Sequence, residues 1–299
     1  CETCFADYVF FCNSGAEAIE AAIKIARRYF YITENSKTKN EIITFTGSFH
    51  GRTLGALAAG GLEKLEGFNT SVPGFKQVKY NDHEGLTAAI TNDTAAILIE
   101  PIQGEGGVSV LPIECLIGLR KLCDENNILL IFDEVQCGFL RSGKMFAHQW
   151  SDIQPDIMTT AKAIANGFPL GATMTTKKVG EVMNHGTHGS TYGGNPLAVA
   201  VGNAVLDLMQ KKDFLENLDK VSEYFFSELQ NISNKFPESI SEIRGKGLIL
   251  GLKCVKDNII FVEELRKQKM LSIKAGDNVV RLLPPLNLSI EECSEAIEK

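Results

Sequence analysis

The sequence lacks an excess of positive charge and lacks any long apolar run. Its 299 residues carry 30 lysines and arginines against 37 aspartates and glutamates, which gives a formal net charge of −7. This balance argues against nucleic acid or an anionic membrane surface as the main partner. No apolar run reaches the roughly 20 residues of a membrane-spanning helix, and residues 1–30 lack the basic start and apolar middle of a signal peptide. A composition of 44% hydrophobic and 22% charged residues is typical of a globular protein of about two domains.

The chain also lacks internal repeats and a second cysteine pair to match Cys1-x-x-Cys4, so a redox or metal half-site there is incomplete. Most of the eight cysteines lie inside apolar segments, as reduced core cysteines do, and we expect a cytoplasmic protein. His185 and His188 lie among glycines, so we expect loop histidines and no metal site. Because the chain begins at Cys1 rather than Met and enters a strand almost at once, we expect an N-terminal portion to be missing.

Residues 128–136 (ILLIFDEVQ) have the pattern of a central parallel strand. Five apolar residues in a row predict burial on both faces, and Asp133 ends the run. A carboxylate at the carboxyl end of such a strand costs free energy to bury unless a cationic group lies beside it. Further along the chain, Lys162 lies among small residues. A pyridoxal phosphate (PLP) site needs two such residues: an acid that meets the ring nitrogen and a lysine that forms an imine with the carbonyl group.

Other segments alternate between strand and helix patterns. Strands are predicted over residues 7–12, 41–46 and 95–99, and helices over residues 15–28, 112–126 and 196–209. This alternation predicts an α/β fold with a mostly parallel wound sheet and helices on both faces. Ligands of such sheets bind beyond the carboxyl ends of the strands, which is where Phe49, Arg52 and Asp133 fall.

The first helix begins at Ser14-Gly15-Ala16, and Ser14 and Glu17 have the spacing of a capping box. The ordinary interpretation is a well-capped helix. The functional alternative is an anion site, because a helix start offers free N–H groups and a positive dipole end, and Gly15 lets a ligand approach.

The domain boundary is predicted near residue 208, between a large domain of residues 1–208 and a small C-terminal α+β domain of residues 209–299. Residues 244–251 are rich in glycine but lack the strand–turn–helix order of a nucleotide loop, so we interpret them as one strand with close backbone packing. A lone Arg281 among apolar residues predicts either snorkelling or an anion ligand.

Six motifs together resemble the class III (ornithine/acetylornithine-type) aminotransferases of the PLP fold type I superfamily. They are residues 10–18 (FFCNSGAEA), 48–55 (SFHGRTLG), 100–107 (EPIQGEGG), 132–136 (FDEVQ), 161–162 (AK) and 188–196 (HGSTYGGNP). They span the chain in the order of the family, so chance agreement is negligible. The resemblance implies an aminotransferase with PLP as cofactor, and a large PLP-binding domain followed by a small C-terminal domain.

The resemblance also implies roles around the cofactor ring. Lys162 would bind the cofactor covalently, Asp133 would pair with the pyridinium nitrogen, and Gln136 would hydrogen-bond the 3-hydroxyl oxygen. Phe49 and Val135 would pack on the two faces of the ring.

For the cofactor phosphate, the resemblance implies binding by Ser14, Gly15 and Ala16 at the helix start. Thr191 would reach the phosphate that the partner subunit binds, so a homodimer with a shared active site is expected.

For the substrates, the resemblance assigns Arg281 to the α-carboxylate of glutamate or 2-oxoglutarate, a task suited to a guanidinium fork. Glu105 would neutralise Arg281 when a terminal amine is the substrate, Arg52 would bind the other carboxylate, and Ser190 is placed with the substrate-binding residues. The implied reaction moves the terminal amino group of N-acetylornithine to 2-oxoglutarate in arginine biosynthesis, with succinyldiaminopimelate as a further donor.

Alternatives stay open. Ornithine, 4-aminobutyrate and other ω-amino acids are alternative donors, because the same charged residues could bind all of them. A PLP-dependent aminomutase would need no 2-oxoglutarate, and Arg281 argues against it. A non-catalytic PLP-fold protein would be expected to lack the lysine or the acid, whereas Lys162 and Asp133 are both present. A dehydrogenase is disfavoured because no glycine fingerprint follows the first strand.

Overall fold

The computed structural model describes residues 1–299, and the chain forms two compact units. Unit 1 comprises residues 1–101, 111–136 and 148–205, and unit 2 comprises residues 102–110, 137–147 and 206–299. Two short segments from the middle of the sequence therefore belong with the C-terminal unit. The division at residue 208 remains a prediction.

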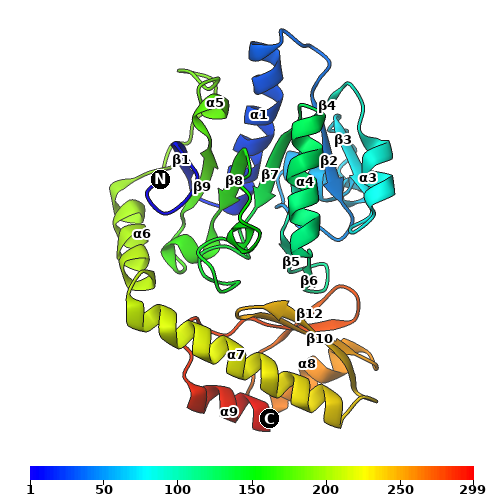
Figure 1. Ribbon diagram of the computed structural model, residues 1–299, viewed down its shortest axis with the longest axis vertical. Helices are drawn as coiled ribbons and strands as arrows, with labels where there is room; N and C mark the ends of the chain where they lie inside the picture. The colour runs from blue at the N-terminus through cyan, green and yellow to red at the C-terminus, as the bar shows by residue number, and fades with distance from the viewer. The chain divides into compact units, whose positions relative to one another are not determined.

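Unit 1 is built on a seven-stranded sheet with the strand order β1-β9-β8-β7-β4-β2-β3 (Figure 1). The strands are β1 (Tyr8–Cys12), β2 (Glu41–Phe45), β3 (Phe75–Val78), β4 (Thr94–Ile99), β7 (Leu129–Asp133), β8 (Ile157–Thr160) and β9 (Gly171–Thr175). The five strands from β8 to β3 are parallel, whereas β9 is antiparallel to both β8 and β1. This confirms the predicted mostly parallel sheet. It also means that β1 points the same way as β8.

Helices cover both faces of this sheet. The helices of unit 1 are α1 (Gly15–Thr33), α2 (Leu54–Gly60), α3 (His83–Ala89), α4 (Ile113–Glu125), α5 (Lys177–Gly180) and most of α6 (Pro196–Met209), whose residues from Leu206 onward belong to unit 2; the 3-10 turns are η1 (Leu62–Leu65), η2 (Ala147–Trp150) and η3 (Lys162–Ala165). The apolar stripe of α1 packs on the sheet, and Ile19, Phe30 and Ile131 share one buried cluster. Each such side chain contributes about 2 kcal/mol by burial. Helix α4, in front of the sheet in Figure 1, packs on β7 from the other face.

Unit 2 carries a four-stranded antiparallel sheet with the order β10-β11-β13-β12. Its elements are β5 (Ile102–Gln103), β6 (Ser109–Val110), α7 (Lys212–Lys235), β10 (Ile240–Lys246), β11 (Ile249–Cys254), α8 (Asn258–Lys267), β12 (Ile273–Ala275), β13 (Val279–Leu282) and α9 (Ile290–Glu298). None of the helices in the chain has the length and apolar content to span a membrane.

The interpretation of residues 244–251 as one strand is wrong. These residues form a tight hairpin in which Lys246 of β10 pairs with Ile249 of β11. The reversal occurs at Gly247, whose φ of +61° lies in the left-handed region that glycine adopts without steric cost. The glycine therefore ends one strand and begins the return of the next.

Candidate active site

The sheet of unit 1 brings several of the predicted site residues to one edge. Asp133 is the last residue of β7, and Lys162 begins the 3-10 turn two residues beyond β8. Ser14 lies beyond β1, and residues 49–52 lie beyond β2. Because these strands point the same way, their carboxyl ends form the edge at which parallel sheets bind ligands.

The carboxylate of Asp133 is only 3% exposed and is held by three donors. Oδ1 accepts from the backbone N–H of Val135 at 3.0 Å and from the Thr159 hydroxyl at 3.3 Å, and Oδ2 lies 2.7 Å from Nδ1 of His50. These contacts fix the orientation of a buried acid that would otherwise be costly.

No role was predicted for His50 from the sequence. Its Nε2 is buried without a hydrogen-bond partner, which favours the tautomer whose single proton sits on Nδ1 and faces Asp133. The available signal was its position between Phe49 and Arg52, in a loop that follows a parallel strand.

Lys162 has a backbone φ of +47°, in the left-handed region. A residue with a side chain there carries strain of about 1–3 kcal/mol, and such strain concentrates at functional sites. The preceding Ala161 is buried and the lysine is exposed, so the strained turn directs the lysine out of the core at the end of β8.

The start of α1 forms one of the two hydrogen bonds of the predicted capping box, and the other goes to a different residue. Ser14 accepts from the backbone N–H of Glu17 at 3.3 Å, as expected. The carboxylate of Glu17, however, accepts from the backbone N–H of Asn13 at 2.5 Å rather than from that of Ser14. The N–H groups of Gly15 and Ala16 take part in no hydrogen bond within the chain, so the positive end of α1 keeps free donors for an anion.

The loop after β2 is anchored at the peptide group between Ser48 and Phe49. Its backbone N–H donates to Oε2 of the buried Glu100 at 3.0 Å, and the ammonium of Lys64 donates to the carbonyl of Ser48 at 2.7 Å. Burial lowers the pKa of Lys64. The guanidinium of Arg52 lies 5.2 Å from the centre of the Phe49 ring. Glu100 and Lys64, for which the sequence predicted no role, thus fix the backbone from which the Phe49 ring projects.

The loop that carries Ser190 and Thr191 also joins the start of α1. The hydroxyl of Ser190 accepts from the side-chain amide of Asn13 at 3.1 Å and from the N–H of Gly193 at 3.1 Å. Thr191 is exposed. Its contact with a phosphate in a second subunit remains a prediction.

Unit 2 brings Arg281 and Glu105 together. Arg281, in β13, is 3% exposed, and its Nη1 lies 2.8 Å from Oε1 of Glu105. Glu105 lies between β5 and β6, where its carbonyl accepts from the N–H of Gly276 at 2.8 Å. Its side chain is 41% exposed. The arginine is therefore the fixed member of this ion pair, and the carboxylate is the member that can leave.

Gly51 allows the loop after β2 to touch the start of α1. Its φ is +129°, and a Cβ there would lie 2.8 Å from Cβ and 3.0 Å from Cα of Ala16. We therefore expect Gly51→Ala to lower the free energy of unfolding by about 2–4 kcal/mol, from backbone strain and overpacking. Urea unfolding measures this loss. The control is Gly118→Ala, at an exposed position of α4 with no atom near the added methyl group, which should be neutral or stabilising. Equal losses in both variants would contradict the prediction.

Comparison with known proteins places this geometry in context. The family model described as aminotransferase class-III matches residues 1–299. The acetylornithine aminotransferase of Brucella melitensis is 53% identical over 298 residues, which cover 99% of this chain and 74% of that protein. The N-acetylornithine aminotransferase structure from Stenotrophomonas maltophilia gives a TM-score of 0.83 at 37% identity, covering 98% of this chain and 73% of that one. An ornithine aminotransferase structure from Toxoplasma gondii, with partial occupancy of PLP at its active site, gives 0.92 at 34% identity, covering 98% and 71%.

Proposed function

The chain belongs to the class-III aminotransferase family, and from this premise we propose that it transfers the terminal amino group of N-acetylornithine to 2-oxoglutarate. The products are the corresponding semialdehyde and glutamate, as in arginine biosynthesis. The similarity to the Brucella acetylornithine aminotransferase over nearly the whole chain carries this proposal. Succinyldiaminopimelate is proposed as a second donor, because it too has an acylated amino acid group at one end and a free amino group toward the other.

PLP is the cofactor of this enzyme class, and the residues of unit 1 fit it. The free N–H groups of Gly15 and Ala16, with Ser14 beside them, suit a phosphate at the positive end of α1. The buried carboxylate of Asp133 suits a protonated ring nitrogen, whose charge would offset the cost of burying the acid. Lys162, at the same edge of the sheet, would hold the cofactor covalently through Nζ.

The remaining assignments complete the cofactor site. Phe49 and Val135 would cover the two faces of the ring, and Gln136 would hydrogen-bond its 3-hydroxyl oxygen. The N–H of Val135 is already tied to Asp133, so a ring held by the acid would meet this side chain in a fixed position. Thr191 would reach the phosphate in the second subunit.

Proton transfer is the step that we assign to Lys162. When bound, PLP supplies an electron sink next to the carbon that carries the amino group. The amine of Lys162 would remove the proton from that carbon as a general base and, as a general acid, deliver it to C4′ of the cofactor. Asp133, oriented by His50 and Thr159, would keep the ring nitrogen protonated. The donor product would leave before 2-oxoglutarate binds, which gives ping-pong kinetics.

We assign Arg52 to one substrate carboxylate and Arg281 to the α-carboxylate of glutamate and 2-oxoglutarate. With Glu105 in place, Arg281 is neutralised, which favours a donor that presents a terminal amine. When the half-exposed Glu105 leaves, the buried guanidinium is available to a carboxylate in a bidentate pair. The ion pair therefore supports an enzyme that must accept two differently charged substrates in turn. Ser190 would contribute a hydroxyl to substrate binding.

Glu105→Gln is expected to raise the rate of the glutamate half-reaction relative to the N-acetylornithine half-reaction by about tenfold. The amide leaves the charge of Arg281 unneutralised, and a charge-assisted hydrogen bond contributes about 1.5–3 kcal/mol. Stopped-flow absorbance of the cofactor measures both half-reactions. Glu114→Gln, at an exposed position of α4, is the matched control. A ratio that changes by less than twofold in Glu105→Gln would remove this role.

We also propose a cytoplasmic homodimer with a shared active site. Tyr192, next to Thr191, is 71% exposed, and Leu197 is 61% exposed, which supports burial of this apolar surface by a second copy. All eight cysteines are free, which supports a reducing compartment. Sedimentation of the holoenzyme should give the mass of two chains, and a monomer that is active would contradict the shared site.

The experiment that tests the substrate is a panel of amino donors with 2-oxoglutarate as the acceptor. N-acetylornithine, ornithine, 4-aminobutyrate and succinyldiaminopimelate are compared by kcat/KM on the purified holoenzyme. We expect the highest value for N-acetylornithine. A higher value for ornithine or 4-aminobutyrate would leave the aminotransferase assignment intact and remove the proposed donor.

A further inference from the structure

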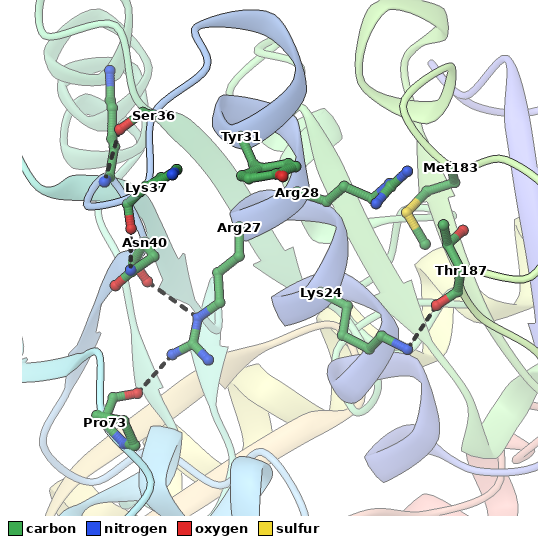
Figure 2. Close-up of a pocket in the computed structure, with 11 residues that line it drawn as sticks. Lys24, Arg27, Arg28, Tyr31, Ser36, Lys37, Asn40, Pro73, Met183 and Thr187 are labelled. Atoms are coloured by element: carbon green, nitrogen blue, oxygen red, sulfur yellow. Dashed lines mark hydrogen bonds between the residues drawn. The ribbon is translucent and has the colours of Figure 1, made fainter.

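A cavity of about 630 Å³ lies on the outer face of α1 in unit 1 (Figure 2). It is separate from the start of the helix, because Arg27 lies twelve residues beyond Gly15 (27 − 15), which is about 18 Å along an α-helix. Nothing in the proposed reaction uses this cavity. Its size is that of a small-molecule site.

The lining of the cavity is strongly cationic. Lys24, Arg27, Arg28, Lys37 and Lys39 line it, and no aspartate or glutamate does. Since the chain as a whole has a formal net charge of −7, this concentration of positive charge is local. Of the five cations, Lys39 has a carboxylate partner, Glu34, at 3.6 Å. The cavity therefore carries positive charge that its own walls do not balance.

Both guanidinium groups of the cavity, those of Arg27 and Arg28, are held in place by neutral acceptors. Arg27 donates to the carbonyls of Asn40 at 3.1 Å and Pro73 at 2.8 Å. Arg28 donates to the carbonyl of Val182 at 2.8 Å and to the side-chain oxygen of Asn184 at 3.1 Å. Such bonds orient a guanidinium without cancelling its charge, so less entropy is lost when an anion binds. Burial lowers the pKa of Arg27 against the opposing influence of Glu20, which means that its charge is partly desolvated.

The cavity also offers a flat apolar surface. Figure 2 draws Tyr31 between Lys37 on one side and Arg28 on the other. The tyrosine is 51% exposed. Figure 2 also shows Arg27 reaching toward Pro73 and Lys24 toward Thr187 on opposite sides of α1. The cations are thus spread across the helix face around an aromatic ring, an arrangement that suits an extended ligand with a flat ring and several negative charges.

We propose that this cavity binds a nucleoside phosphate, with the phosphate oxygens among the five cations and the base stacked on Tyr31. Phosphate groups carry the charge that the walls leave unbalanced, and their oxygens can accept from Nη1 of each arginine, because the bonds to neutral acceptors use Nε and Nη2. A plain dicarboxylate would meet the cations but would leave the tyrosine ring uncovered. A nucleoside without phosphate would meet the ring but would leave the charge unbalanced.

Calorimetric titration of the holoenzyme tests the proposal. Saturation with PLP keeps the cofactor phosphate site filled, so a probe that binds there is excluded. We expect ADP to bind tightest, pyrophosphate more weakly and adenosine not measurably, and the ADP affinity should fall as salt is raised. Absence of ADP binding at near-physiological salt, or citrate binding as tight as that of ADP, would overturn the proposal.

Substitutions locate the site. Lys37→Gln, which changes an exposed side chain, should lower the affinity for ADP by about fivefold, the scale of one exposed charge pair. The double variant Arg28→Gln with Lys37→Gln should lower it by about tenfold or more. Tyr31→Leu should lower the affinity for ADP without changing the affinity for pyrophosphate. The charge-matched control is Lys121→Gln with Lys212→Gln, two exposed lysines in α4 and α7. If the control loses as much affinity as the cavity variants, binding follows net charge and the site is wrong.

Discussion

Lys162→Ala is expected to lower kcat by at least about 10,000-fold while leaving the chain folded. The amine at this position would both hold the cofactor and move the proton, and general acid–base catalysis alone contributes about 100- to 10,000-fold. The side chain is exposed beyond the end of β8, so its removal leaves no cavity in the core. Steady-state kinetics with N-acetylornithine and 2-oxoglutarate measures the loss, and circular dichroism reports on the fold.

Two variants separate the chemistry of this lysine from its charge. Lys162→Arg keeps a positive charge but has no free amine at neutral pH, and should be as inactive as the alanine variant. Lys177→Ala removes another exposed lysine of unit 1 and should keep kcat within twofold. If Lys162→Ala keeps a tenth or more of the parental turnover, then Lys162 is not the catalytic base.

Asp133→Asn is expected to lower kcat by about 100- to 1,000-fold, the scale of removing one preorganised electrostatic contact. The amide is nearly isosteric and can still accept from the N–H of Val135, so the end of β7 should keep its structure. It lacks the negative charge that would hold a proton on the cofactor ring nitrogen. Kinetics together with the dissociation constant for PLP separate a slower proton transfer from weaker cofactor binding.

The controls for this substitution come from the same region of the chain. Asp152→Asn changes an exposed acid and should leave kcat within twofold. His50→Asn removes the imidazole that faces Oδ2 of Asp133 and should cost about tenfold, because the acid keeps its charge but loses one of the groups that orient it. Turnover of Asp133→Asn at the parental rate would refute an electrostatic role for the acid.

Local pattern was enough for the elements with strong signals. The apolar run before Asp133 forms β7, and the helix predicted over residues 112–126 is α4, with Pro112 and Asn126 as its flanking caps. The helix predicted to start at Pro196 starts there. In these segments periodicity, turn residues and burial agree, and such agreement makes local sequence decisive.

Three strands of the large sheet, β3, β8 and β9, were not predicted from the sequence, because their segments are short or carry weak local signals. Strand β3, Phe75–Val78, contains lysine and glutamine and lies at the sheet edge. Strand β9, Gly171–Thr175, is made of small and polar residues apart from Met174. Its five residues are nonetheless buried, because it is hydrogen-bonded between β1 and β8. Pairing with neighbours that are distant in sequence supplies the stability that these segments lack on their own.

The sequence by itself determined the reaction class, because the chemistry depends on residue types at motif positions, among them Asp133, Lys162 and the helix start at Ser14. Tertiary structure alone decided which side chains support them: His50 meets Asp133, and Arg281 meets Glu105 across 176 positions of chain (281 − 105). It also closed the α1 cavity, whose cations all lie within residues 24–39, with Pro73, Met183 and Thr187 from distant parts of the chain. Contacts of this kind leave no local periodicity, because long-range packing and strand pairing, rather than neighbouring residues, bring the groups together.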